Sequence, residues 1–480
     1  MASRKLTRRG FLKAAGVGAA AVTVPGISRL LSAAGSSPKP NFIVFFSDDQ
    51  GYQDIGCFGS GQHGSPPYQP PAISTPNLDR MATEGIKFTD FYVPASVCSA
   101  SRAALMTGCY NRRVSVGGAY TPASTHGLNP NEITIAEVLK PLGYATACIG
   151  KWHLGHLSQF LPTNQGFDYY YGIPYSNDLY PGCPWGASQG FPALPVLENT
   201  TKVEANPNQA LLTKKYTEKA YQFIRKNKDG PFFLYMPYTA PHWPLHASDK
   251  FRGKSTRVYS DVVMEMDWSV GVILKAVKDL GLDNNTLAIF VSDNGPWLMR
   301  DYADRGCALP LREGKWSVYE GGMRVPCIMR WPDHIPANKT CAEVAGTIDI
   351  LTTLAVLAGT TAPQDRTIDG ENIWPLMASQ AGATSPHDYF FFENNTVRSG
   401  KWKLHLARSG VREYVWNGST YVAAYPTFND RLFDLSTNKE ESNDGAAETL
   451  ATNNPSIVTN MKDALNAFNA DIAANARPEG

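Results

Sequence analysis

The feature that most constrains the fold is a series of short, uninterrupted apolar runs that alternate with helical patterns. The runs cover residues 41–46, 144–149, 232–236 and 286–291. Strands that are apolar on both faces are typical of a parallel sheet covered by helices. Helical patterns lie between them, over residues 77–85, 133–142, 211–226 and 259–280. The sequence therefore predicts an α/β fold with a large mixed, mostly parallel sheet sandwiched by helices.

The pattern changes near residue 370. Short aromatic-rich runs at 389–393, 401–406 and 414–416 are typical of antiparallel strands, and residues 455–474 predict a closing helix. We therefore expect a large N-terminal domain over residues 38–370 and a smaller C-terminal α+β subdomain with an antiparallel sheet over residues 371–480.

The N-terminus has the pattern of an export signal. Arg8 and Arg9 form a twin-arginine pair, an apolar stretch follows over residues 14–24, and small residues at 32–34 offer a cleavage site. The apolar stretch is about half of the roughly 20 residues that span a bilayer, so a transmembrane helix is disfavoured. We expect residues 1–34 to direct bacterial twin-arginine export to the periplasm or beyond. The export machinery is then a partner, and no membrane contact is expected after the signal is removed.

Charge and cysteine content exclude other classes of protein. Removal of the six basic residues before position 35 takes the formal net charge from +1 to about −5, which argues against a nucleic-acid-binding surface. The eight cysteines are scattered without a CxxC pair, so neither a zinc site nor a dense disulfide framework is expected. One or two disulfides after export remain open.

Polar residues follow the carboxyl ends of the four predicted strands. They are Asp48-Asp49, the segment 150–153, His242 and Asp293-Asn294. Open α/β sheets bind ligands at this edge, so the four segments are expected to converge on one site.

Two of these segments supply only oxygen ligands. Asp48, Asp49, Asp293 and Asn294 offer no sulfur or imidazole, and such a set suits a hard cation, with Ca²⁺ favoured over Mg²⁺ in an irregular cage. The alternative is that these residues only cap turns after strands.

Cys98 precedes Arg102 and a run of good helix formers. This spacing places the thiol at a helix N-terminus, where backbone N–H groups and the arginine favour an anion. The alternative is a buried cysteine that merely begins a helix.

The segment Cys98-Ser-Ala-Ser-Arg-Ala-Ala-Leu-Met-Thr-Gly108 closely resembles the signature of the formylglycine-dependent (type I) sulfatases, in which the cysteine is oxidised to formylglycine. Further motifs match that family in order, at residues 48–52, 150–155, 240–242, 292–295, 314–315 and 319–322, and residues 172–176 resemble its arylsulfatase A-like members. The resemblance implies an alkaline phosphatase-like fold and the hydrolysis of sulfate monoesters.

The resemblance also implies a mechanism. Formylglycine (3-oxoalanine) at position 98 is hydrated, and one hydroxyl, held by one Ca²⁺ together with the four oxygen ligands, attacks sulfur and displaces the alcohol. Asp293 or a neighbour activates this hydroxyl. The second hydroxyl then loses its proton to His153. This loss of the proton expels sulfate and restores the aldehyde.

Further roles follow from the same resemblance. Arg102 orients the formylglycine, while Lys151, Lys315 and His242 hold the sulfate oxygens as charge builds. His242 or Lys315 is the expected acid for the departing oxygen. Ser176 is expected to place a hydroxyl near the hydrate or the sulfate.

Ala100 departs from the commoner signature, which has proline there. The Cys-x-Ala-x-Arg form resembles substrates of the radical-type bacterial maturation enzymes. A formylglycine-generating maturase is thus an expected partner, and activity depends on a host that supplies it.

Two other functions stay open at this point. One is a phosphonate or phosphodiester hydrolase of the same superfamily, and the other is a non-catalytic binder of sulfated glycans with Cys98 left as a thiol. The expected substrate is a sulfated carbohydrate or an aryl sulfate. Trp243, Trp297 and Trp316, beside the matched motifs, serve either sugar stacking or core packing.

Overall fold

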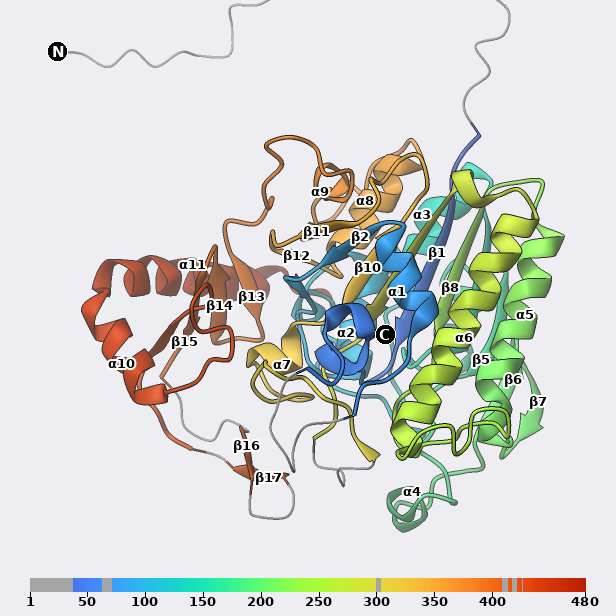
Figure 1. Ribbon diagram of the computed structural model, residues 1–480, viewed down its shortest axis with the longest axis horizontal. Coiled ribbons are helices and arrows are strands. Elements are labelled where there is room, and N and C mark those ends of the chain that lie inside the picture. The colour runs from blue at the N-terminus through green and yellow to red at the C-terminus, as the bar shows by residue number, and fades with distance from the viewer. Residues whose placement is uncertain (1–37, 63–70, 299–303, 408–412, 417–420, 425) are drawn as a thin grey trace, which may run out of the picture. The chain divides into compact units, whose positions relative to one another are not determined.

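A computed structural model of the chain describes residues 38–62, 71–298, 304–407, 413–416, 421–424 and 426–480 (Figure 1). The predicted export signal lies outside the described residues. Lys39–Gly480 form one compact unit, and the predicted boundary at residue 370 stays a prediction. Among the described helices, none has the length and apolar character that crossing a bilayer requires.

The centre of the unit is the predicted parallel sheet. Five parallel strands lie in the order β9-β1-β8-β4-β5 within a ten-stranded sheet. Their bounds are β1 Asn41–Ser47, β4 Ala145–Lys151, β5 Tyr169–Ile173, β8 Phe232–Pro237 and β9 Thr286–Ser292. The four predicted apolar runs are four of these strands. β1 lies between β9 and β8 in the middle of the sheet, so its side chains are buried on both faces.

Antiparallel strands extend the sheet at both edges, which makes it mixed. β10 runs antiparallel to both β9 and β2, and β11 lies beyond, parallel to β2; at the other edge β6 and β7 are antiparallel. The bounds are β2 Ile86–Phe88, β6 Pro195–Glu198, β7 Thr201–Ala205, β10 Cys327–Arg330 and β11 Lys339–Cys341. A small parallel pair joins β3 Phe91–Tyr92 to β12 Ala345–Gly346.

Helices cover both faces of the sheet. Ile43 and Phe45 of β1 pack into a core with α1, α5 and α6, while Phe42 and Val44 point to the opposite core with α2, α3 and α8. Figure 1 shows α5 and α6 side by side over the first face. The bounds are α1 Pro76–Thr83, α2 Cys98–Thr107, α3 Ile135–Leu139, α5 Leu212–Lys226, α6 Val258–Asp279 and α8 Asp349–Leu357.

The predicted helix over 133–142 is shorter than expected. Only Ile135–Leu139 is α-helical, and Lys140–Leu142 continues as a 3₁₀ turn. Pro141 has no N–H to donate, and Gly143 follows at φ 89°, which ends the turn in the left-handed region.

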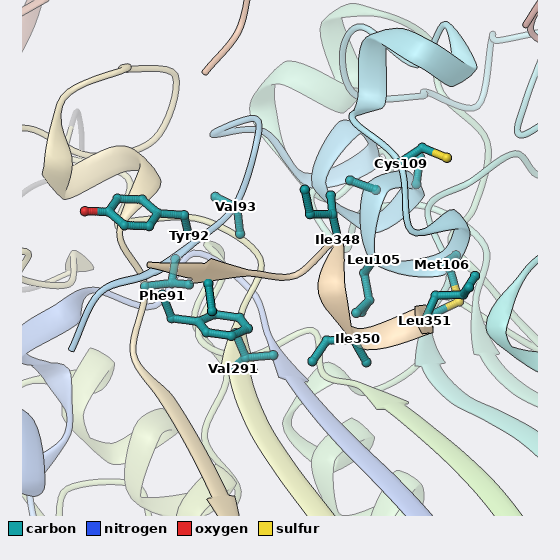
Figure 2. Close-up of a cluster of buried hydrophobic side chains, with 14 of the residues drawn as sticks. Phe91, Tyr92, Val93, Leu105, Met106, Cys109, Val291, Ile348, Ile350 and Leu351 are labelled. Atoms are coloured by element: carbon teal, nitrogen blue, oxygen red, sulfur yellow. The ribbon is translucent and has the colours of Figure 1, made fainter. Parts of the chain in front are cut away.

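The helix that begins at Cys98 is anchored by an apolar cluster. Leu105 and Met106 of α2 pack beside Ile350 and Leu351 of α8, as Figure 2 shows. All four are buried, and burial of a leucine or isoleucine side chain contributes about 1.5–3 kcal/mol. The N-terminus of α2 is therefore held in a fixed position at the sheet edge.

The C-terminal part contains the predicted antiparallel sheet and closing helix. β13 Phe390–Phe392, β14 Thr396–Ser399, β15 Trp402–His405 and β18 Arg431–Asp434 form a four-stranded sheet. β16 Glu413–Trp416 and β17 Tyr421–Ala424 form a separate hairpin. The closing helix α11 spans Pro455–Asn475, and the remaining helices are α4 Pro184–Ser188, α7 Glu320–Met323, α9 Trp374–Met377 and α10 Asp444–Asn453.

Candidate active site

The acidic residues after β1 and β9 lie together, because the two strands are in register up to Ser47 and Ser292. The backbone N–H of Asp49 donates to Oδ1 of Asp293 at 3.0 Å, and Nδ2 of Asn294 donates to Oδ1 of Asp49 at 2.7 Å. Asp49 has φ 59°, a left-handed conformation that aspartate tolerates better than most residues. The predicted convergence of these carboxylates is therefore present.

The donor set fits a cation. Oδ1 of Asp48 and Oδ1 of Asn294 are buried and have no hydrogen-bond partner among the described residues. Ligand atoms of Asp48, Asp49, Cys98 and His242 lie within 4.8 Å of one another. Buried oxygens without a donor are costly unless an ion satisfies them. His242 belongs to this group although the sequence predicted only oxygen ligands and residue 98.

Cys98 begins α2, as predicted. The residue before it, Val97, has no side chain that could cap the helix, so the first-turn N–H groups face the site. Cys98 is 2% exposed, and burial raises the pKa of its thiol to about 12. As encoded, the side chain is therefore a neutral thiol and a poor nucleophile.

Arg102 lies one turn along α2 and is fully buried. Its Nη2 donates to Oδ2 of Asp293 at 2.8 Å, and its Nη1 donates to the carbonyl of Lys151 at 2.9 Å. The same Nη2 lies 3.6 Å from Oδ1 of Asp48. Arg102 thus links the helix that begins at Cys98 to the ends of three strands.

Lys151 ends β4 and lies directly beside the acidic residues. Its Nζ donates to Oδ2 of Asp48 at 2.6 Å and to Oγ of Ser176 at 3.1 Å. Gly150, at φ 140°, permits the turn because a Cβ there would strike the carbonyl of Pro237. Ser176, which follows β5, is therefore connected to the acidic residues by its hydrogen bond from Lys151.

Lys315 and His242 form the other side of the site. Nζ of Lys315 lies 2.8 Å from Oδ2 of Asp49 and 3.1 Å from Nε2 of His242. Nδ1 of His242 contacts the carbonyl of Trp243. Burial lowers the pKa of His242 well below its usual value, and the charge of Lys315 adds to this effect.

His153 is fixed in one tautomer. Its Nε2 lies 2.8 Å from the carbonyl of Tyr120, which can only accept, so Nε2 carries the proton. Its Nδ1 is buried and has no hydrogen-bond partner among the described residues. Burial lowers the pKa of His153 well below 6.5, with Lys151 adding to the effect. The ring is therefore neutral, and Nδ1 has a free lone pair.

The carboxylates differ in their pKa values. Burial acts to raise the pKa of Asp48, but Lys151 and other nearby cations outweigh it and hold that pKa below its usual range. Burial raises the pKa of Asp49, and burial together with repulsion from Asp48 raises the pKa of Asp293 to about 7. Bringing three carboxylates together is therefore costly without further positive charge.

A pocket of about 430 Å³ opens above Cys98. His153, Ser176, His242 and Lys315 line it beside Cys98. Its remaining wall is largely aromatic, with Tyr120, Trp185, Trp243, Trp297 and Trp316. The three tryptophans named in the sequence are therefore pocket residues, and Trp297 also packs edge-on against both others, with ring centroids 6.4 and 5.2 Å apart.

All eleven predicted site residues are brought to one edge of the sheet. Sequence reasoning missed Tyr120, whose carbonyl orients His153, and the pocket residues Asp178 and Trp185. Asp178 stands two residues after Ser176, so its position next to a matched motif was an available signal. Nothing local marks Tyr120. All eight cysteines are free thiols.

Comparison with known proteins identifies the family. The model for the sulfatase family matches residues 40–360, that for the C-terminal part of N-sulphoglucosamine sulphohydrolase matches residues 314–471, and a twin-arginine signal model matches residues 5–25.

Individual relatives agree with these matches. Arylsulfatase A of Homo sapiens is 40% identical, covering 77% of this chain and 75% of its own. N-acetylgalactosamine-6-sulfatase of Rattus norvegicus is 37% identical, and the match covers 80% of this chain and 74% of that protein. The solved structure of Ps i-CgsB in complex with k-i-k-neocarrahexaose is similar at a TM-score of 0.72 and 29% identity, covering 92% of this chain and 94% of that one.

The twin-arginine signal marks the protein for export. Members of the matched family use formylglycine and a divalent metal, and the buried acidic cluster fits such a metal. The chain belongs to the sulfatase family and is an exported sulfuric ester hydrolase.

Proposed function

We propose that this enzyme removes sulfate from a sulfated carbohydrate. It uses a formylglycine that is made from Cys98, together with one bound Ca²⁺. The names of the relatives support the substrate class: one acts on an N-acetylgalactosamine 6-sulfate, and another was solved with a carrageenan-type oligosaccharide.

The observation that carries the proposal is the position of residue 98. It lies at the N-terminus of α2, within 4.8 Å of carboxylate and imidazole ligand atoms, at the base of a pocket lined by Lys315 and His242. Helix N-terminal N–H groups and nearby cations stabilise an anion at this point. A sulfate ester that enters the pocket therefore meets residue 98 and positive charge together.

The charge balance of the site supports a divalent cation. Three carboxylates and three side-chain cations meet here, namely Asp48, Asp49, Asp293, Arg102, Lys151 and Lys315. These charges compensate one another, so a divalent cation gives the site the net positive charge that an anionic ester needs. Asp48, Asp49, Asp293 and Asn294, with residue 98, would hold it, and oxygen ligands favour Ca²⁺. When bound, the cation would supply a Lewis acid beside residue 98.

The chain's own residues divide the remaining work. The hydrated formylglycine supplies the hydroxyl that attacks sulfur, and Asp293, whose pKa is raised to about 7, accepts the proton of that hydroxyl. Nδ1 of His153, with its free lone pair, accepts a proton from residue 98 when sulfate is expelled. Lys151, Lys315 and His242 hold the sulfate oxygens, and Arg102 keeps residue 98 in place.

A protonated group must also reach the departing alcohol. Lys315 and His242 share a contact of 3.1 Å, and burial opposes a charge on the imidazole. Asp49 raises the pKa of Lys315 despite its burial, so the lysine keeps its proton. Lys315 is therefore the proton source, directly or through His242, for the leaving oxygen. A maturase that oxidises the Cys-x-Ala-x-Arg form is the partner this scheme requires.

The test compares ester classes and metal content. Enzyme co-expressed with a radical-type maturase is assayed on 4-nitrophenyl sulfate and 4-nitrophenyl phosphate, before and after exhaustive chelation. We expect a clear preference for sulfate, loss of activity on chelation, and recovery with Ca²⁺ rather than Mg²⁺. A preference for the phosphate ester would contradict the proposed function, and equal recovery with both ions would contradict the choice of Ca²⁺. Cys98→Ala measures the background rate.

A further inference from the structure

Asp178 is a buried carboxylate in the pocket that the reaction does not use. It lies in the turn after β5, is 8% exposed, and lines the same pocket as residue 98. Its Oδ1 is buried and has no hydrogen-bond partner among the described residues. A carboxylate oxygen in this state is costly unless a bound ligand donates to it.

The turn that carries Asp178 is held rigidly. The neighbouring Asn177 donates from Nδ2 to Oε1 of Gln209 at 3.0 Å, and Nε2 of Gln209 donates back to the carbonyl of Asn177 at 3.0 Å. Asn177 also donates to the carbonyl of Pro244 at 3.3 Å. The Asp178 carboxylate is therefore placed in the pocket before substrate arrives, which reduces the entropy lost on binding.

Trp185 stands at the rim of the same pocket. It lies in the short helix α4, and its ring packs edge-on against Phe191 with centroids 5.2 Å apart. Even so, 47% of Trp185 is exposed. An exposed, laterally supported indole that lines a pocket suits the C–H face of a sugar ring.

We propose that Asp178 and Trp185 select the ring that carries the sulfate ester. Asp178 accepts hydrogen bonds from free hydroxyl groups of that ring, and Trp185 packs against its apolar face. The negative charge of Asp178 disfavours a second sulfate on the hydroxyls it binds. The selected substrate is thus a monosulfated pyranose with free hydroxyls on the far side of the ring from the ester, an assignment that rests on the proposed function.

The test uses the ratio of two kcat/KM values. One substrate is 4-nitrophenyl sulfate, which has no sugar hydroxyls, and the other is the best substrate among monosulfated galactose, fucose and N-acetylglucosamine derivatives. Asp178→Asn is expected to lower the sugar-to-aryl ratio 10- to 100-fold, because a charge-assisted hydrogen bond is lost at a site built to hold it. Asp229→Asn, which alters an exposed carboxylate outside the pocket, is expected to leave the ratio unchanged.

Two further measurements separate selection from structural damage. Asp178→Asn is expected to gain relative activity on the disulfated form of the same sugar, which a merely destabilised enzyme would not do. Trp185→Ala is expected to raise KM for the sugar about 10-fold, and Trp185→Phe to restore most of the loss.

The outcomes distinguish this proposal from the proposed function. An equal loss on both substrates in Asp178→Asn, or an unchanged ratio, overturns the role of Asp178. Hydrolysis of the aryl sulfate without any activity on the sugars also overturns it, while leaving the sulfatase reaction intact. Failure of formylglycine-bearing wild-type enzyme on every sulfate ester would instead contradict the proposed function itself.

Discussion

At the scale of single residues, the site places a protonated, unreactive thiol beside several charged side chains. Burial keeps Cys98 protonated, with a pKa of about 12, although Lys151 and Lys315 act to lower it. The cations and the helix N-terminus therefore do not make this cysteine a thiolate. They are arranged for an anion above it, which is what a sulfate ester brings.

Lys315 offers a residue-scale prediction. Lys315→Ala removes a buried cation that contacts Asp49 and His242. We expect kcat on 4-nitrophenyl sulfate to fall about 10²- to 10³-fold, because charge that develops on the sulfate oxygens and the leaving group loses its partner. Steady-state kinetics measure this, with exposed Lys339→Ala as the control. A loss confined to KM would contradict the assignment.

At the scale of elements, a cluster of buried charges connects α7 to the C-terminal sheet. α7 follows Lys315 closely in the chain. Nζ of Lys403, in β15, lies 2.8 Å from Glu320 of α7 and 3.2 Å from Glu441. All three are fully buried, and Oε2 of Glu441 accepts from the backbone N–H of Glu320. The C-terminal strands therefore fix the segment that positions Lys315.

Removal of Lys403 tests this cluster. Lys403→Met leaves two buried carboxylates without their shared cation, and we expect the free energy of unfolding to fall by about 3–5 kcal/mol. Lys401→Met is the matched control, because Lys401 is half exposed and its pair with Asp434 contributes about 0–1 kcal/mol. Chemical denaturation measures both variants. Equal effects of the two substitutions would show that the buried cluster does not stabilise the fold.

Glu441 adds a pH-dependent prediction. Burial raises its pKa from 4.5 to about 7 in the folded protein, even though Lys403 opposes the shift. A raised carboxyl pKa means that the folded state binds more protons than the unfolded state between these values. The contribution of Glu441 to stability is then complete below pH 4.5 and is lost as the pH rises through about 7.

The matching variant is Glu441→Gln, which cannot ionise. We expect the free energy of unfolding of this variant to increase relative to that of wild type as the pH rises from about 4.5 to 7, because only wild type must ionise a buried carboxyl group. Denaturant titrations at a series of pH values provide the measurement. A difference between the two proteins that stays constant across this range would contradict a raised pKa at Glu441.

At the scale of the whole molecule, the sequence predicted the strands and the residues that follow them. β1, β4, β8 and β9 are continuous apolar runs, and this pattern alone places their polar successors at one sheet edge. The family resemblance supplied the remaining residues and the expected roles. Every predicted site residue lies in one cluster.

Other features could not be predicted, because they depend on contacts between distant segments. Glu320 meets Lys403 across 83 positions and Glu441 across 121, with no local pattern to connect them. The antiparallel strands β6, β7 and β10 are too short to carry a periodic signal. His242 was predicted to reach the site, but its place among the possible metal ligands depends on its loop lying beside Asp49, which no local pattern shows.

The most direct test of the account is mass spectrometry of the peptide that contains residue 98, paired with activity on 4-nitrophenyl sulfate. Preparations with and without a co-expressed maturase provide a range of conversion. We predict that the peptide carries an aldehyde in place of the CH₂SH group, and that kcat per total enzyme rises in proportion to the aldehyde fraction. Full activity in a preparation that holds only the unmodified thiol would contradict the account.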